Sequence, residues 1–119
     1  MSFRTLFRGI SAISPAAAAA LAMALFRKPP RHRDSGEERE ALARAERLPF
    51  SLDGRRLAAW RWGRGPAVLL VHGWGSRGAR FVDLGGALLA SGFRVVTFDA
   101  PGHGASSGRL SSGPEFSRA

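Results

Sequence analysis

The sequence predicts an α/β fold preceded by a helical arm. Four aliphatic residues in a row, at 68–71, leave no polar face, which is typical of a strand covered by helices on both sides. A glycine-rich run at 72–78 follows, and apolar residues then recur at helical spacing. A second strand, at 93–98, ends in another glycine-rich loop at 99–104. This order predicts a right-handed βαβ crossover, which places both loops at one edge of a parallel sheet.

Length and composition limit the classes of protein that this chain can form. Its 119 residues suffice for one small domain, and the absence of cysteine excludes disulfides and thiolate metal sites. The net charge of +9 is concentrated in residues 1–33, which contain six basic residues and no acidic one. No nucleic-acid-binding module and no basic patch interleaved with aromatic residues is visible. We therefore expect no nucleic-acid partner, and we expect no cofactor and no metal.

The composition changes along the chain predict a basic, alanine-rich arm at 1–33, a charged helical linker at 34–47 and a partial α/β domain at 48–119. In the arm, Ser14 is a good N-cap and Pro15 suits a first helical turn, so a helix is predicted at 15–26. Twelve helical residues extend about 18 Å, against roughly 30 Å for the hydrocarbon core of a bilayer. We do not expect the arm to span a membrane.

Four interpretations of the arm remain open from the residues alone. Its basic start and apolar middle fit a cleaved secretory signal, and its arginines and missing acids fit a mitochondrial presequence. The arginines would also suit an interfacial helix on anionic lipid. The fourth interpretation is an alanine-rich helix that caps the following domain. We expect a cytoplasmic protein, and the alternative is that the arm associates with a membrane.

The linker and the first strands carry short-range signals. Ser35 and Glu38 match a capping box, which predicts a solvated helix in the linker. Strand-like runs at 48–52 and 55–62 flank Asp-Gly, a strong signal for a two-residue β-hairpin turn. Trp60 and Trp62 lie two positions apart, and we expect both to pack against neighbouring elements.

The helix of the crossover should begin near Ser76 or Arg77, because Phe81, Leu84, Leu88 and Leu89 recur at helical spacing. Gly92 stands where a C′ glycine would end this helix. The two glycines at 85 and 86 suggest close contact with the sheet. A further helix can start at residues 112–113, before Pro114.

The two loops carry a specific resemblance. His72-Gly73-Trp74-Gly75 after the first strand, with Asp99-Ala100-Pro101-Gly102-His103-Gly104-Ala105-Ser106 after the second, resembles the amino-terminal part of an α/β-hydrolase. The resemblance is to the esterase, lysophospholipase or serine aminopeptidase type, and it covers about residues 47–119. It implies a sheet that starts with a hairpin and continues into the βαβ crossover, and a small-molecule ester or amide as substrate.

The resemblance also implies a role for each loop residue. The main-chain N–H of Trp74 matches an oxyanion-hole donor, and Gly73 and Gly75 form the turn that aims it. His72 supports this loop and is not the catalytic histidine of the family. In the second loop, Asp99, Pro101, Gly102, His103 and Gly104 shape the edge of the active site and are not expected to be triad members.

Ser106 satisfies Gly-x-Ser-x-Gly, but we expect it not to be the nucleophile. A nucleophile elbow lies directly between a strand and a helix, whereas the strand here ends near residue 99. In this fold the nucleophile, the acid and the histidine would all follow residue 119, so the chain alone is expected to be inactive. The strand at 68–71 would then form a bare hydrophobic edge, which predicts a poorly soluble or only partly ordered chain.

Two alternatives from other classes stay open. One is a basic arm that binds anionic membrane or nucleic-acid surfaces and carries a noncatalytic α/β module. The other is a phosphate-binding βαβ unit, since the spacing of Gly73, Gly75 and Gly78 does not exclude a nucleotide loop.

Overall fold

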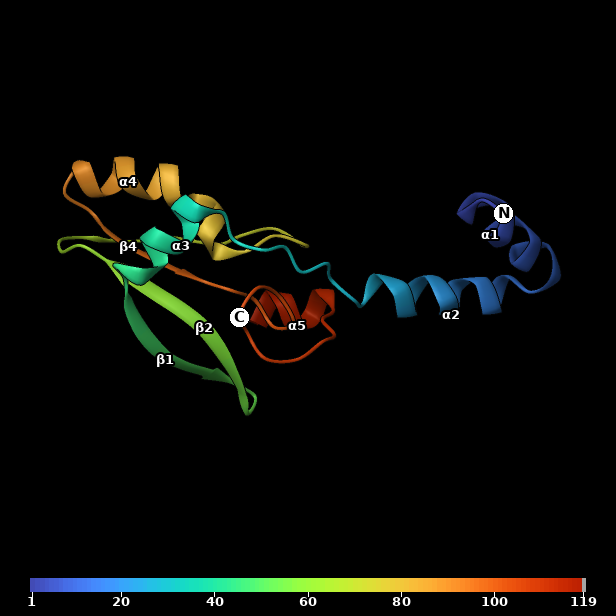
Figure 1. Cartoon of the computed structure of the whole chain (residues 1–119). Coiled ribbons are helices and arrows are strands. Elements are labelled where there is room, and N and C mark those ends of the chain that lie inside the picture. Colours follow the sequence, from blue (N-terminus) through green and yellow to red (C-terminus); the bar gives the residue numbers. More distant parts are fainter. Residues whose placement is uncertain (119) are drawn as a thin grey trace.

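The computed structural model describes residues 1–118 (Figure 1). The elements in chain order are α1 (Phe3–Ile13), α2 (Pro15–Phe26), α3 (Gly36–Ala43), β1 (Glu46–Leu52), β2 (Arg55–Trp62), β3 (Ala67–Leu70), the 3₁₀ helix η1 (Gly78–Phe81), α4 (Val82–Ala90), β4 (Arg94–Phe98) and α5 (Gly113–Arg118). The predicted α/β fold is confirmed.

The four strands form one mixed sheet in the order β1-β2-β4-β3. The hairpin strands β1 and β2 pair antiparallel, β2 pairs antiparallel with β4, and β3 pairs parallel with β4. The hairpin turns at Asp53 and Gly54, whose φ angles are 48° and 74°. Two positive φ angles are the requirement of a type I′ turn, so the Asp-Gly signal is explained.

The crossover from β3 to β4 runs through η1 and α4 on one face of the sheet. A Cβ at Gly78 would meet the Thr97 side chain, and one at Gly85 would lie 3.7 Å from Val95. Close contact with the sheet is therefore confirmed for Gly85, whereas Gly86 faces open space. The first turn is a 3₁₀ helix, and Gly92, with φ 85°, follows the C-cap residue as predicted.

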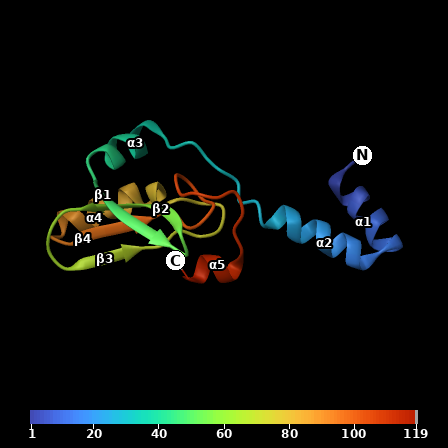
Figure 2. The same cartoon turned by 90° about the horizontal axis from the view of Figure 1, so that it is seen from below.

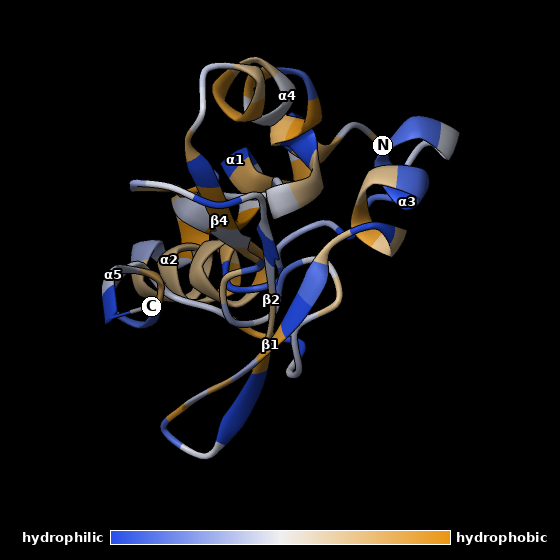
Figure 3. Ribbon diagram, turned by 90° about the vertical axis from the view of Figure 1, so that its left-hand side faces the viewer, coloured by the Kyte–Doolittle hydropathy of each residue, from blue (hydrophilic) through white to orange (hydrophobic). Residues whose placement is uncertain are grey.

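The expectation that helices cover both faces of the strand at 68–71 is wrong for the described residues. Leu69 and Val71, on the face opposite α4, are 58% and 50% exposed, and β3 is an edge strand. Further along this face, Leu57, Ala59 and Phe98 form a buried cluster against which Phe116 of α5 packs. Figure 3 shows the sheet with α4 on one side.

The arm contains two helices where the sequence pattern predicted one. Helix α2 has the predicted bounds and the Ser14 cap, and α1 begins after Ser2, whose side chain accepts a hydrogen bond from Thr5 N. The two helices pack on each other and extend away from the sheet (Figures 1 and 2), so α2 does not cap the domain. Among residues 1–118, no helix is long and apolar enough to cross a bilayer.

Candidate functional site

Two buried histidines join the loops that follow β3 and β4. His72, in the first loop, accepts a hydrogen bond at Nε2 from Ala100 N of the second loop, at 2.9 Å. His103, in the second loop, accepts at Nε2 from Gly75 N of the first loop, at 3.0 Å. Each loop thus holds the other through a side chain and a main-chain amide. The structure brings together the two loops whose residues the sequence singled out.

The hydrogen bonds fix the protonation of both imidazoles. Nδ1 of His72 lies 2.7 Å from Gly73 O, and Nδ1 of His103 lies 3.0 Å from Pro101 O. A carbonyl oxygen only accepts, so Nδ1 carries the proton in each ring and Nε2 is the acceptor. Burial lowers the pKa of His103 below its ordinary value, which favours this neutral form.

Asp99 ties the second loop to the start of the crossover helix. Its Oδ1 accepts from Gly78 N at 2.7 Å, and its Oδ2 accepts from Ala105 N at 2.8 Å. Burial raises the pKa of Asp99, and the two main-chain donors partly offset that rise. A Cβ at Gly104, where φ is 46°, would clash with the Asp99 carboxylate. Asp99 therefore holds the loop in a shape that needs glycine there.

Ser106 has the contacts of a structural serine. Its hydroxyl donates to Asp99 O at 2.5 Å and accepts from Ala58 N at 2.8 Å, and the side chain is 2% exposed. Both partners are main-chain groups, and no histidine is among them. A serine without an adjacent general base is a weak nucleophile.

The main-chain amide of Trp74 lies between fixed neighbours. Gly75 N donates to His103, and Ser76 N donates to Gly73 O at 3.1 Å. Among residues 1–118, Trp74 N donates to no acceptor. Its indole stacks on Phe26 of α2, with ring centroids 4.8 Å apart, and meets His103 edge-on at 5.0 Å.

The segment at residues 27–35, between α2 and α3, binds the loop that follows β4 from outside, and we call it the strap. Arg31 donates from Nη1 to Gly104 O at 2.7 Å, and from Nη2 to Ser106 O at 3.1 Å and to Gly108 O. Arg27 O accepts from Ser111 N at 2.8 Å. Sequence reasoning missed the strap, because partners more than seventy positions away leave no short-range pattern.

A buried charge cluster anchors α3 beside the crossover. Arg77 donates from Nη2 to Glu38 at 2.5 Å and from Nε to Asp34 at 2.7 Å. Burial alone would raise the pKa of Glu38, but hydrogen bonds from Arg77 and Ser35 N bring it below the ordinary value. The capping box predicted at Ser35 is confirmed, and Glu38 serves both the cap and the ion pair.

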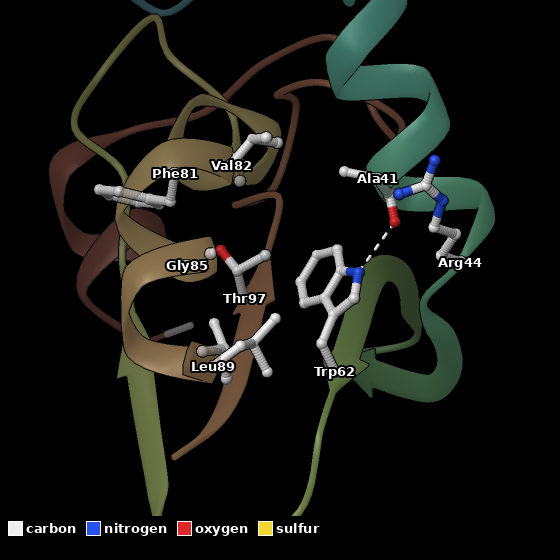
Figure 4. Close-up of a pocket in the computed structure, with 11 residues that line it drawn as sticks. Ala41, Arg44, Trp62, Phe81, Val82, Gly85, Leu89 and Thr97 are labelled. Atoms are coloured by element: carbon white, nitrogen blue, oxygen red, sulfur yellow. Dashed lines mark hydrogen bonds between the residues drawn. The ribbon is translucent and has the colours of Figure 1, made fainter. Parts of the chain in front are cut away.

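A separate apolar cavity of about 260 Å³ lies between α3, α4 and the sheet. Figure 4 shows Trp62 at its wall, with the indole N–H donating to Ala41 O at 2.8 Å. No residue of the two loops at 72–75 and 99–106 lines it. Among residues 1–118, no three His, Asp or Glu side chains gather as a metal site.

Comparison with solved structures gives the class of protein. The chain superimposes on the thioesterase domain of the curacin biosynthetic pathway with a TM-score of 0.50 and 34% identity, over 53% of this chain and 23% of that one. It matches an epoxide hydrolase from Vigna radiata with a TM-score of 0.51 and 28% identity, over 66% and 23%. An esterase from Pyrococcus furiosus, at 23% identity and a TM-score of 0.56 over 70% and 34%, shares the fold. These neighbours are α/β-hydrolases.

Sequence comparison narrows the class. Residues 65–119 match the family described as serine aminopeptidase, S33. A stretch of 45 residues is 49% identical to the pimeloyl-[acyl-carrier protein] methyl ester esterase of Methylococcus capsulatus, over 35% of this chain and 16% of that protein. Through these residues the chain is similar to members of the α/β-hydrolase superfamily. It spans between 16% and 34% of the length of the relatives named here.

Proposed function

We propose that residues 65–119 supply the oxyanion-hole loop of a serine hydrolase acting on a small-molecule ester or amide. Trp74 N–H would be one of the two donors to the oxyanion. The observation that carries the proposal is the Trp74 amide, which has no acceptor among the described residues although its neighbours are held by His103 and Gly73.

The physical reason lies in preorganisation. A donor that is already fixed stabilises developing negative charge without reorganising at the moment of reaction, and removing one such donor slows catalysis by about 10²–10³-fold. The reciprocal histidine bonds hold the Trp74 loop against the second loop from both sides. The donor is the main-chain N–H, so the proposal gives the indole, which stacks on Phe26 and meets His103 edge-on, no chemical role.

In this proposal, the nucleophile, the acid and the catalytic histidine come from polypeptide outside residues 1–119. The contacts of Ser106 support this division, because its hydroxyl is occupied by main-chain groups. The curated relative of 49% identity is an esterase, which supports ester hydrolysis as the reaction type. The chain alone should leave a fluorophosphonate serine probe unreacted. Stoichiometric labelling of Ser106 would contradict the proposal.

A hybrid enzyme tests the donor directly. Residues 65–119 would replace the matching stretch of the Methylococcus capsulatus esterase, and kcat would be measured on a chromogenic ester. Trp74→Pro removes the N–H and should lower kcat by about 10²–10³-fold. Trp74→Phe keeps the N–H and should stay within about threefold of the parent hybrid. Equal rates for the two variants, in hybrids of equal folded content, would overturn the proposal.

A further inference from the structure

The arm presents an apolar surface that the rest of the chain leaves uncovered. In α1, Phe3 and Ile13 are 65% and 89% exposed, and in α2 Met23 and Leu25 are 56% and 43% exposed. The two helices pack on each other, while Figures 1 and 2 show both extending from the body of the molecule. Exposed apolar side chains that gather on one surface are typical of a site that contacts another protein or a membrane.

Helix α1 separates apolar from basic residues around its axis. With 3.6 residues per turn, its large apolar side chains fall within an arc of about 120°. They are Phe3, Leu6, Phe7, Ile10 and Ile13. Arg4 and Arg8 lie together beside this arc. Such a helix suits a boundary between an apolar and an anionic layer.

The charge of the arm has one sign. Residues 1–33 contain Arg4, Arg8, Arg27, Lys28, Arg31 and Arg33 and no acidic residue. Arg31 is engaged by the carbonyls of the second loop, so the other five cations remain for a partner. A nucleic acid would use the cations but would leave the apolar arc in water. A bilayer of anionic phospholipid satisfies both.

We propose that the arm binds the surface of an anionic phospholipid bilayer. The apolar arc of α1 and the exposed side chains of α2 enter the boundary between headgroups and acyl chains, and Arg4, Arg8, Arg27 and Lys28 meet headgroup phosphates. The strap would then keep the bound arm close to the Trp74 loop, through the Phe26 stack and Arg31. This binding is independent of whether Trp74 N–H serves catalysis.

Sedimentation of the full chain with vesicles tests the proposal. We expect binding to phosphatidylcholine vesicles that contain phosphatidylglycerol, and at least about tenfold weaker binding to pure phosphatidylcholine. Raising NaCl from about 0.1 M to about 1 M should weaken binding, because the charges are exposed. No binding of the wild type to the anionic vesicles would overturn the proposal.

Paired variants separate the contribution of the basic residues from that of the apolar side chains. Arg4→Gln with Arg8→Gln should weaken vesicle binding by about tenfold or more, and Leu6→Ser with Ile13→Ser should do the same. The control, Arg64→Gln with Arg109→Gln, removes two exposed charges outside the arm and should bind like the wild type. Vesicle binding by the Leu6/Ile13 variant equal to that of the wild type would overturn the proposal. So would tighter binding to duplex DNA than to vesicles, if the Arg4/Arg8 substitutions weakened DNA binding as they weaken vesicle binding.

Discussion

His103 and Gly75 are 28 positions apart, yet the imidazole Nε2 of His103 accepts the main-chain N–H of Gly75 at 3.0 Å. This bond fixes the amide next to Trp74, and it exists only while Nε2 is unprotonated. The histidine that the family resemblance assigned to loop shape thus contacts the candidate oxyanion loop directly. Its protonation should control how firmly the two loops are joined.

Acidification should therefore destabilise the chain through His103. Burial holds the pKa of His103 below the ordinary 6.5, so the unfolded chain binds more protons than the folded one as the pH falls below 6.5. The contribution of His103 is present above pH 6.5 and is lost as the pH falls through the lowered pKa. We expect the thermal midpoint of dilute protein to decrease over this range.

The control for this pH effect is His103→Gln, whose side-chain oxygen can still accept from Gly75 N but does not titrate. Its midpoint should depend less on pH between neutrality and pH 5 or so. Asp99 acts in the opposite direction, because its pKa is raised and its contribution is lost as the pH rises. An equal pH dependence in wild type and His103→Gln would refute the assignment.

Substituting Gly104 should damage the second loop. Gly104→Ala combines a positive φ with a clash against the Asp99 carboxylate, so we expect a loss of roughly 1–3 kcal/mol in unfolding free energy. Gly86→Ala is the matched control, since its added methyl meets nothing within 4 Å and alanine favours the helix by about 1 kcal/mol. Urea titrations would compare them, and a neutral Gly104→Ala would show that the loop adapts.

Removing Arg77 should lower the free energy of unfolding more than removing an arginine from an exposed ion pair. Arg77→Ala leaves Glu38 buried without its partner, and we expect a loss of roughly 3 kcal/mol or more. Arg44→Ala breaks the pair with Glu40, in which both side chains are more than 70% exposed, and should change stability by less than about 0.5 kcal/mol. Equal losses in chemical unfolding would contradict the burial argument.

The hydroxyl of Ser106 should matter for stability. Ser106→Ala leaves Ala58 N without its acceptor in a buried position, and we expect a loss of about 1–3 kcal/mol. The neighbouring Ser107 is exposed and uses only main-chain groups, so Ser107→Ala should be within about 0.5 kcal/mol of wild type. Melting curves that coincide for the two variants would count against the Ser106 contacts.

The uncovered edge strand should promote self-association. Leu69 on β3 and Val71 directly after it are half exposed, and β3 pairs on one side only. Leu69→Lys places a charge on this edge and should raise the concentration at which the chain stays monomeric in analytical ultracentrifugation. Leu57→Lys, at a buried position on the same face, should instead prevent folding. A wild-type chain that stays monomeric at micromolar concentration would contradict the expected self-association.

Much of the fold could be predicted because its signals are local. Ser14 with Pro15, Ser35 with Glu38 and Asp53 with Gly54 each act within four positions, where the chain's own geometry brings the groups together. Helix α1 carried the same kind of signal, Ser2 before an apolar repeat, although only one helix was predicted in residues 1–33. The hydrophobic runs indicated where the strands lie along the chain, and the helical repeat between two of them predicted the crossover.

By itself the sequence determined the elements, the turn, the caps and which residues stand in the two glycine-rich loops. Tertiary structure alone decided that Arg31 would hold the carbonyls of the second loop, that Ser106 would bond Ala58, and that Arg77 would join Glu38. These partners are 39 to 77 positions apart. Hydrogen bonds and ion pairs at such separations follow from where the sheet and its crossover place the backbone, and no local pattern of residues encodes that placement.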